Sequence, residues 1–132
     1  MKSSEITTGA ILLAHGSNDG RWKKPFQQLT KKVQDQKSNV IVELAYMEFT
    51  EPTITMAMNK IVEQSTRVKR VYLIPLFLAA GGHLLHDVPR LVKQLTQAYP
   101  DIQFIQSGPI GEEAIVQAAI QQAIHNFLGE NI

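Results

Sequence analysis

The stretch AILLAHGSND, Ala10–Asp19, decides the fold that this chain is expected to adopt. Its first five residues form a continuous apolar run, which is typical of a strand buried on both faces of a sheet. Histidine, glycine and polar residues follow directly, as expected where a buried strand ends at the surface. Because a strand covered on both faces needs helices on both sides, the stretch indicates a parallel sheet in an α/β protein.

The alternation of apolar strands and amphipathic helices continues along the chain. Further strands are expected at Val40–Met47, Val68–Leu78 and Ile102–Ser107, and helices at Trp22–Lys37, after Pro52, after Pro89 and near the C-terminus. The regular part of the third strand is expected to end near Ile74, because Pro75 cannot donate to the ladder. This order predicts a single three-layer α/β domain over residues 1–132, with a four-stranded parallel sheet and helices on both faces.

The first and last helices each have an apolar side at helical spacing. In the first helix this side consists of Phe26, Leu29 and Val33. In the last helix it consists of Val116, Ile120, Ala123, Ile124 and Phe127. Both sides are expected to take part in packing the layers of the domain.

Length, composition and charge limit the classes of protein to which the chain can belong. The 132 residues fit one domain, and an apolar fraction of 44% is enough for a core. A formal net charge of +1 gives no reason to expect nucleic acid or a membrane as partner. Without cysteine, a transition metal would need nitrogen and oxygen ligands. The chain has neither a signal-peptide pattern nor a membrane-length apolar run, so a cytoplasmic location is expected.

The loops after the strands carry the candidate site. His15 follows the first strand, Glu48 the second and His83 the third. Because the carboxyl ends of parallel strands share one edge of the sheet, where ligands bind, these three residues are expected to meet there. Two imidazoles and a carboxylate suit a divalent first-row metal. The same groups accept protons near neutral pH, since a free histidine titrates at about 6.5.

Each of these residues also has an ordinary structural interpretation. His15 is able to cap the following helix, Glu48 to be a solvated loop carboxylate, and His83 to be a turn residue after two glycines. His86 is expected at the surface of the first helical turn, where Asp87 is the expected N-cap. Trp22 belongs either to a solvated helix start or to the rim of a site for a flat acidic ligand.

Motifs that are missing narrow the choice of function further. The sequence has neither the glycine-rich dinucleotide fingerprint nor a phosphate-binding P-loop, so no nucleotide cofactor is expected. It also lacks the G-x-S-x-G turn that presents a nucleophilic serine in α/β-hydrolases.

Three segments resemble the short, single-domain members of the sirohydrochlorin chelatase family, the class II metal chelatases. They are LLAHGSND (Leu12–Asp19), AYMEFTEPTI (Ala45–Ile54) and VYLIPLFLAAGGHLLHDVPRLV (Val71–Val92), and they stand in the order of the family's motifs. The resemblance covers about Ala10–Ile124. It departs from the family's pattern at Asn18, where the family often has arginine, and at Glu112 and Glu113. These departures concern substrate contacts more than the metal site.

The resemblance implies an ATP-independent enzyme that inserts Co²⁺ or Fe²⁺, or Ni²⁺ as in archaeal relatives, into a sirohydrochlorin-type tetrapyrrole for cobalamin or sirohaem synthesis. His15 and His83 match the metal-binding and catalytic histidines, and Glu48 matches the family's acidic residue. The substrate's carboxylates would need polar and cationic partners, for which Ser17, Arg21 and Arg90 are the candidates, with Lys23, Lys24 and Lys93 near the same edge.

A homodimer is expected, because one four-stranded unit offers a flat macrocycle only one wall of a cleft. Larger relatives of the resembled family carry two such units in one chain. Two other functions stay open at this point. One is a metal-binding or tetrapyrrole-binding module without turnover, and the other is a hydrolase or another enzyme on a similar sheet.

Overall fold

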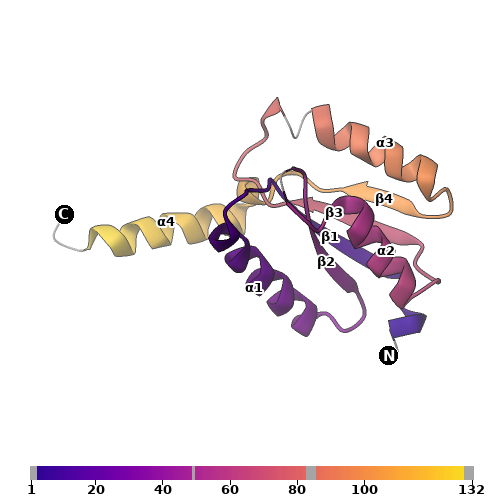
Figure 1. Ribbon diagram of the computed structural model, residues 1–132. Coiled ribbons are helices and arrows are strands. Elements are labelled where there is room, and N and C mark those ends of the chain that lie inside the picture. Colours follow the sequence, from indigo (N-terminus) through magenta and orange to yellow (C-terminus); the bar gives the residue numbers. More distant parts are fainter. Residues whose placement is uncertain (1–2, 49, 83–85, 130–132) are drawn as a thin grey trace.

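The computed structural model describes residues 3–48, 50–82 and 86–129 (Figure 1). Its four strands are β1 (Thr8–Ala14), β2 (Ile41–Tyr46), β3 (Arg70–Pro75) and β4 (Gln103–Gln106). They form one parallel sheet in the order β2-β1-β3-β4. Strand β1 pairs with both β2 and β3, so it runs through the middle of the sheet as its continuous apolar run predicts.

The described residues form four α-helices and two 3₁₀ turns besides the strands. The helices are α1 (Gly20–Gln36), α2 (Ile54–Gln64), α3 (Val88–Ala98) and α4 (Ala114–Leu128), and the turns are η1 (Ser3–Glu5) and η3 (Ile110–Glu112). Helices α2 and α3 cover one face of the sheet, and α1 covers the other (Figure 1). The predicted α/β fold with a four-stranded parallel sheet and helices on both faces is confirmed.

Apolar side chains pack in two clusters, one on each face of the sheet. The larger cluster lies under α2 and α3 and includes Ile11, Leu13, Met58 and Leu73, all fully buried. The smaller cluster lies under α1 and includes Leu12 and residues of β2. Burial of both faces of β1 fixes its register, because a shift by one residue would exchange the side chains of the two clusters.

Local details differ from the sequence expectations at a few positions. Strand β3 extends one residue past Ile74 and includes Pro75, and the Leu76 amide after it still donates to the carbonyl of Leu13 on β1. Leu29, expected on the packed side of α1, is 42% exposed. Asp87 stands at the N-cap position of α3, but its side chain makes no capping hydrogen bond there.

Helix α4 departs most from the layered plan. It leads away from the sheet (Figure 1), and none of its residues is buried. The apolar side that was expected to pack is therefore not covered by the described parts of this chain. Its main neighbour is η3, where the Gln117 side chain donates to the carbonyl of Gly111.

Within the described residues, no helix has the length and the apolar character needed to cross a membrane.

Candidate functional site

The ladder between β1 and β2 continues beyond both strands and joins two of the predicted site residues. The amide of Met47 donates to the carbonyl of Ala14 at 2.9 Å, and the amide of Glu48 donates to the carbonyl of His15 at 3.0 Å. Both His15 and Glu48 are partly buried. The structure therefore brings these two residues together at the carboxyl edge of the sheet, where ligands bind in parallel α/β folds.

Gly16 makes this close approach possible. Its φ angle of +111° lies in a region that other residues rarely adopt. A Cβ atom at this position would lie 1.8 Å from the carbonyl oxygen of Glu48, well inside van der Waals contact. The glycine of the segment H-G-S is thus required by the backbone that holds His15 next to Glu48.

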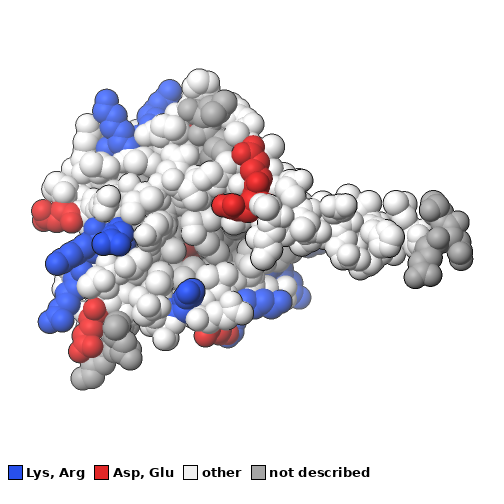
Figure 2. All heavy atoms as spheres, turned by 180° about the vertical axis from the view of Figure 1, so that it is seen from behind, with Lys and Arg blue, Asp and Glu red and all other residues white. Residues whose placement is uncertain are grey.

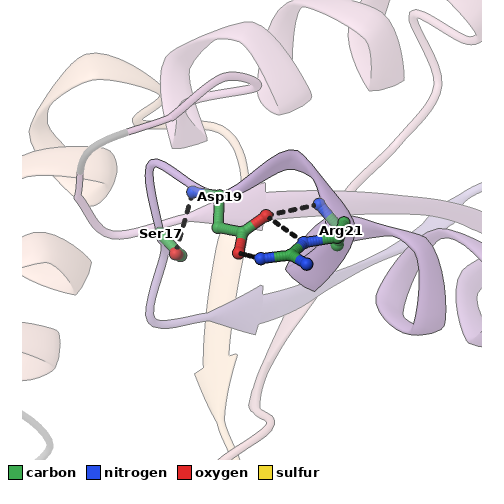
Figure 3. Close-up of polar contacts among 3 residues, drawn as sticks. All are labelled: Ser17, Asp19 and Arg21. Atoms are coloured by element: carbon green, nitrogen blue, oxygen red, sulfur yellow. Dashed lines mark hydrogen bonds and ion pairs between the residues drawn. The ribbon is translucent and has the colours of Figure 1, made fainter.

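The next residues form a small polar turn that starts α1 (Figure 3). The Ser17 hydroxyl accepts from the Asp19 amide at 3.1 Å, and the Asp19 carboxylate accepts from the Arg21 amide at 3.0 Å. The Arg21 guanidinium also pairs with Asp19, at 2.9 Å. These hydrogen bonds hold the pKa of Asp19 below its usual value and raise the pKa of Arg21.

A pocket of about 730 Å³ opens beside Glu48. Its walls come from three places: the end of β2 and the segment after it, the first turn of α2, and the start of α3. The charged side chains in its lining are Glu48, Glu51, Asp87 and Arg90. Volumes of this size are usual for small-molecule sites, and the mixed lining offers both acceptors and a cation. Arg90 thus lies at the same pocket as Glu48, whereas Ser17 and Arg21 do not line it.

Tyr46 forms part of the same wall and was not among the residues that the sequence singled out. Its side chain is 2% exposed, yet its hydroxyl has no hydrogen-bond partner among the described residues. Burial raises the pKa of this phenol. Trp22 packs on Phe26 and Tyr46, with ring centroids 4.5 and 5.8 Å away, so Trp22 belongs to the packing of α1 on the sheet.

The segment that follows β3 lies next to His15 and is fixed by η3. The rings of His15 and Phe77 are 6.2 Å apart between centroids. The Gly111 amide donates to the Phe77 carbonyl at 2.9 Å, and a Cβ on Gly111 would come within 2.3 Å of Leu78. The close contact between these two segments requires glycine at position 111 and ties the root of α4 to the site.

His83, the third residue of the predicted site, lies outside the described residues. His86, three positions later, is exposed, as the sequence predicted. In the parts of the chain that the structure describes, no three histidine, aspartate or glutamate side chains gather as a set of metal ligands. The described geometry therefore supplies the pair of His15 and Glu48 and the adjoining pocket, and the metal-ligand role of His83 stays a prediction.

The family model described as CbiX matches residues 9–126, which is nearly the whole chain. The chain belongs to the CbiX family. The resemblance seen in the three sequence segments is confirmed by this match.

Known relatives and solved structures agree with this assignment. Over 82 residues the chain is 42% identical to the sirohydrochlorin cobaltochelatase of Methanocaldococcus jannaschii, covering 62% of this chain and 56% of that protein. The crystal structure of a CbiX protein from Marinobacter aquaeolei VT8, described as putative and in cobalamin biosynthesis, superposes with a TM-score of 0.78 at 34% identity, covering 92% of this chain and 94% of that one.

A second solved structure shows the fold alone, because its identity to this chain is only 23%. It is the sirohydrochlorin chelatase SirB from Bacillus subtilis subspecies spizizenii in complex with cobalt, with a TM-score of 0.78 over 90% of this chain and 50% of that one. The chain spans about half the length of several curated relatives that it matches, between 45 and 56%.

Proposed function

We propose that this CbiX-family chain is a sirohydrochlorin chelatase that inserts a divalent metal ion into a sirohydrochlorin-type tetrapyrrole without using a nucleotide. The observation that carries the proposal is the joining of His15 to Glu48 at the carboxyl edge of the sheet, beside a pocket of about 730 Å³. Nitrogen and oxygen donors suit Co²⁺, Fe²⁺ and Ni²⁺, which are the candidate metal substrates. Relatives are named as cobaltochelatases and ferrochelatases, which supports the first two metals.

In this proposal, the tetrapyrrole loses two pyrrole protons as the metal ion enters. His15 and His83 bind the incoming metal ion, and one of them accepts a proton after the metal has passed to the macrocycle. A neutral imidazole serves either purpose, since it offers one nitrogen lone pair to a metal or a proton. Glu48 is the second proton acceptor. Its backbone hydrogen bond to His15 holds the two residues in a fixed relation, so the protein contributes positioning as well as basicity.

The substrate's carboxylates would be bound by cationic and polar groups around this edge. Arg90 has the best position for this role, because it lines the pocket that contains Glu48. Ser17, just before α1, and Arg21, in its first turn, would contact the substrate from the segment that follows His15. Arg21 is highly exposed and pairs with Asp19, so contact with a carboxylate would require it to exchange or share this partner.

We also propose that the active form is a homodimer in which a second copy provides the opposite wall of the cleft. The pocket is walled by the end of β2, the first turn of α2 and the start of α3 of one chain. A single chain of this kind would leave one face of a flat macrocycle uncovered. The SirB chain, of which this chain covers 50%, is long enough to hold two such units, which supports the same arrangement.

An absorbance assay tests the proposed activity. Purified protein is mixed anaerobically with sirohydrochlorin and with Co²⁺, Fe²⁺ or Ni²⁺ in turn, and the spectral change of the tetrapyrrole is followed against a protein-free control. Insertion that is faster than the control for at least one metal, with turnover beyond one equivalent, is the expected result. Binding of metal or tetrapyrrole without turnover would contradict the proposal and favour a non-catalytic binding module.

A further inference from the structure

The interior strand β3 is fully covered on only one face of the sheet. Val71 and Leu73, which face α2 and α3, are completely buried. Tyr72 and Ile74 on the opposite face are only partly buried, and so is Ile105, which pairs with Tyr72 from β4. Interior strands of parallel sheets normally have both faces covered. We call Tyr72, Ile74 and Ile105 the open half-face.

Helix α4 is apolar, but none of its residues is buried against the sheet. Among the described residues seven large apolar side chains are exposed, and four of them lie on α4: Ile115, Ile124, Phe127 and Leu128. Phe127 is 90% exposed. The helix contains no lysine, arginine, aspartate or glutamate along its length, and Figure 2 shows it as an uncharged arm. An exposed apolar surface of this kind marks an interaction site.

The apolar residues of α4 form a regular stripe. Val116, Ile120, Ala123 and Phe127 follow one another at steps of four, three and four, which places them on one side of an α-helix. The polar residues Gln122 and His125 lie on the opposite side of the helix from this stripe. A stripe about 17 Å long, at 1.5 Å per residue, is the shape that packs across neighbouring strands of a sheet.

The path of the chain keeps α4 away from its own open half-face. The first turn of α4 is tied to η3 by the hydrogen bond from Gln117 to Gly111, and η3 is tied to the segment after β3 by the hydrogen bond from Gly111 to Phe77. From this anchor the helix leads outward from the sheet (Figure 1). Each copy therefore carries an uncovered helix and an uncovered half-face that it does not bring together.

We propose that two copies of this chain exchange their α4 helices, so that the stripe of each helix packs on the open half-face of the other copy. Both partners supply the same two surfaces, so a twofold axis closes the arrangement and leaves neither surface exposed. Burial of the large apolar side chains that are exposed on the single chain stabilises the dimer. No charged group of α4 has to be desolvated, because the helix has none.

The exchange would place the partner beside the candidate site. The root of α4 contacts the segment that contains Phe77, and the Phe77 ring lies 6.2 Å from that of His15. The partner copy would thus approach from the side of the sheet edge that holds His15. This consequence rests on the proposed function, whereas the exchange of α4 itself does not.

Sedimentation equilibrium at 1–100 µM tests the association. The wild-type chain is expected at twice its monomer mass of 14.8 kDa. Phe127→Glu places a charge in the buried stripe and is expected to raise the dimer dissociation constant at least about a hundredfold. Gln122→Glu adds the same charge on the opposite side of α4 and is expected to remain dimeric. A monomeric wild type, or a Phe127→Glu variant that associates as tightly as wild type, would overturn the proposal.

Chemical cross-linking shows which chain α4 packs on. The sequence has no cysteine, so introduced cysteines are the only thiols. Differently tagged Ile105→Cys and Ile124→Cys chains are refolded together and treated with a short bismaleimide. A cross-link between the two tagged chains is expected. A further variant carries both cysteines in one chain and is treated in the same way. If this variant cross-links within itself while the mixed single-cysteine chains do not cross-link, α4 folds back on its own sheet and the proposal is wrong. A dimer with no cross-link at all also contradicts it.

These measurements are independent of catalysis. The dimer could be confirmed while sirohydrochlorin and metal give no turnover, which would reject only the proposed function. Conversely, a chelating monomer would reject the exchange of α4 and the homodimeric active form, and would leave the proposed chelation standing.

Discussion

The amide of Glu48 donates a 3.0 Å hydrogen bond to the carbonyl oxygen of His15, so two residues 33 positions apart in sequence are joined at the ends of neighbouring strands. The bond continues the β1–β2 ladder beyond both strands. The sheet edge thereby holds the backbone of a candidate metal ligand next to that of a candidate proton acceptor. Rigid placement of this kind is what a reaction that combines metal transfer with proton removal requires.

Gly16→Ala is expected to disrupt this relationship. The new Cβ would overlap the Glu48 carbonyl, and the φ of +111° is strained for alanine. We expect a loss of at least about 2 kcal/mol in the free energy of unfolding, measured by urea denaturation, together with a loss of chelation. Gly20→Ala is the control, since nothing lies within 4 Å of its Cβ and alanine favours the helix. Equal urea midpoints for Gly16→Ala and wild type would contradict this account.

Asp19 and Arg21 are expected to differ in what their removal affects. Asp19→Ala removes the N-cap of α1 and should lower the melting temperature by roughly a few degrees, whereas Asp19→Asn keeps an acceptor and should not.

The Arg21→Ala variant should leave the melting temperature nearly unchanged, because the ion pair between Arg21 and Asp19 is exposed. If Arg21 binds substrate carboxylates, the same variant should raise the KM for the tetrapyrrole about three- to tenfold with little change in kcat. An unchanged KM removes Arg21 from the binding site.

Glu43 gives the fold a dependence on pH. Burial on β2 raises the pKa of this carboxyl above its ordinary value of 4.5, an effect that nearby Lys60 partly opposes. A raised folded-state pKa means that ionisation destabilises the fold, progressively as pH rises from 4.5 through the folded-state pKa. Glu43→Gln should therefore be more stable than wild type at pH 7 and equal to it well below pH 4.5. Thermal melts at both values check this, and a Glu43→Gln variant less stable at pH 7 would show the sign to be wrong.

The two histidines of the loop after β3 should not be equivalent. His83→Ala is expected to lower the turnover of chelation at least about a hundredfold, the low end for loss of a proton-transfer group. His86 is exposed in the structure, and His86→Ala is expected to cost less than about threefold. Steady-state chelation by both variants, with circular dichroism to show that they are folded, separates the two roles. An inactive His86→Ala beside a nearly normal His83→Ala would mean that the site is misplaced within this loop.

The strands of the sheet could be predicted from the sequence because buried positions carry apolar residues. The continuous apolar run before His15 predicted an interior strand, and β1 is buried on both faces. The same reasoning placed His15 and Glu48 at one edge, because parallel strands share the direction of their carboxyl ends. Chain direction alone, without any contact information, was therefore enough to bring these two residues together.

Contacts between side chains could not be predicted from sequence periodicity. The exposure of Leu29 and the burial of the Tyr46 hydroxyl depend on how α1 is rotated over the sheet, which spacing alone does not determine. The apolar stripe that contains Phe127 predicts that α4 packs on another surface. The spacing of the stripe does not determine whether that surface belongs to the same chain. An apolar surface that its own chain does not cover can be recognised only once the fold is known.

The initial rate of Co²⁺ insertion into sirohydrochlorin by wild type and His15→Ala tests the central claim most directly. The rate is followed by the absorbance of the tetrapyrrole, with His125→Gln, an exposed histidine of α4, as control. The account predicts that wild type and the control insert cobalt at equal rates and that folded His15→Ala is at least about a hundredfold slower. A His15→Ala rate within about threefold of wild type, or no insertion by wild type above the protein-free rate, would contradict it.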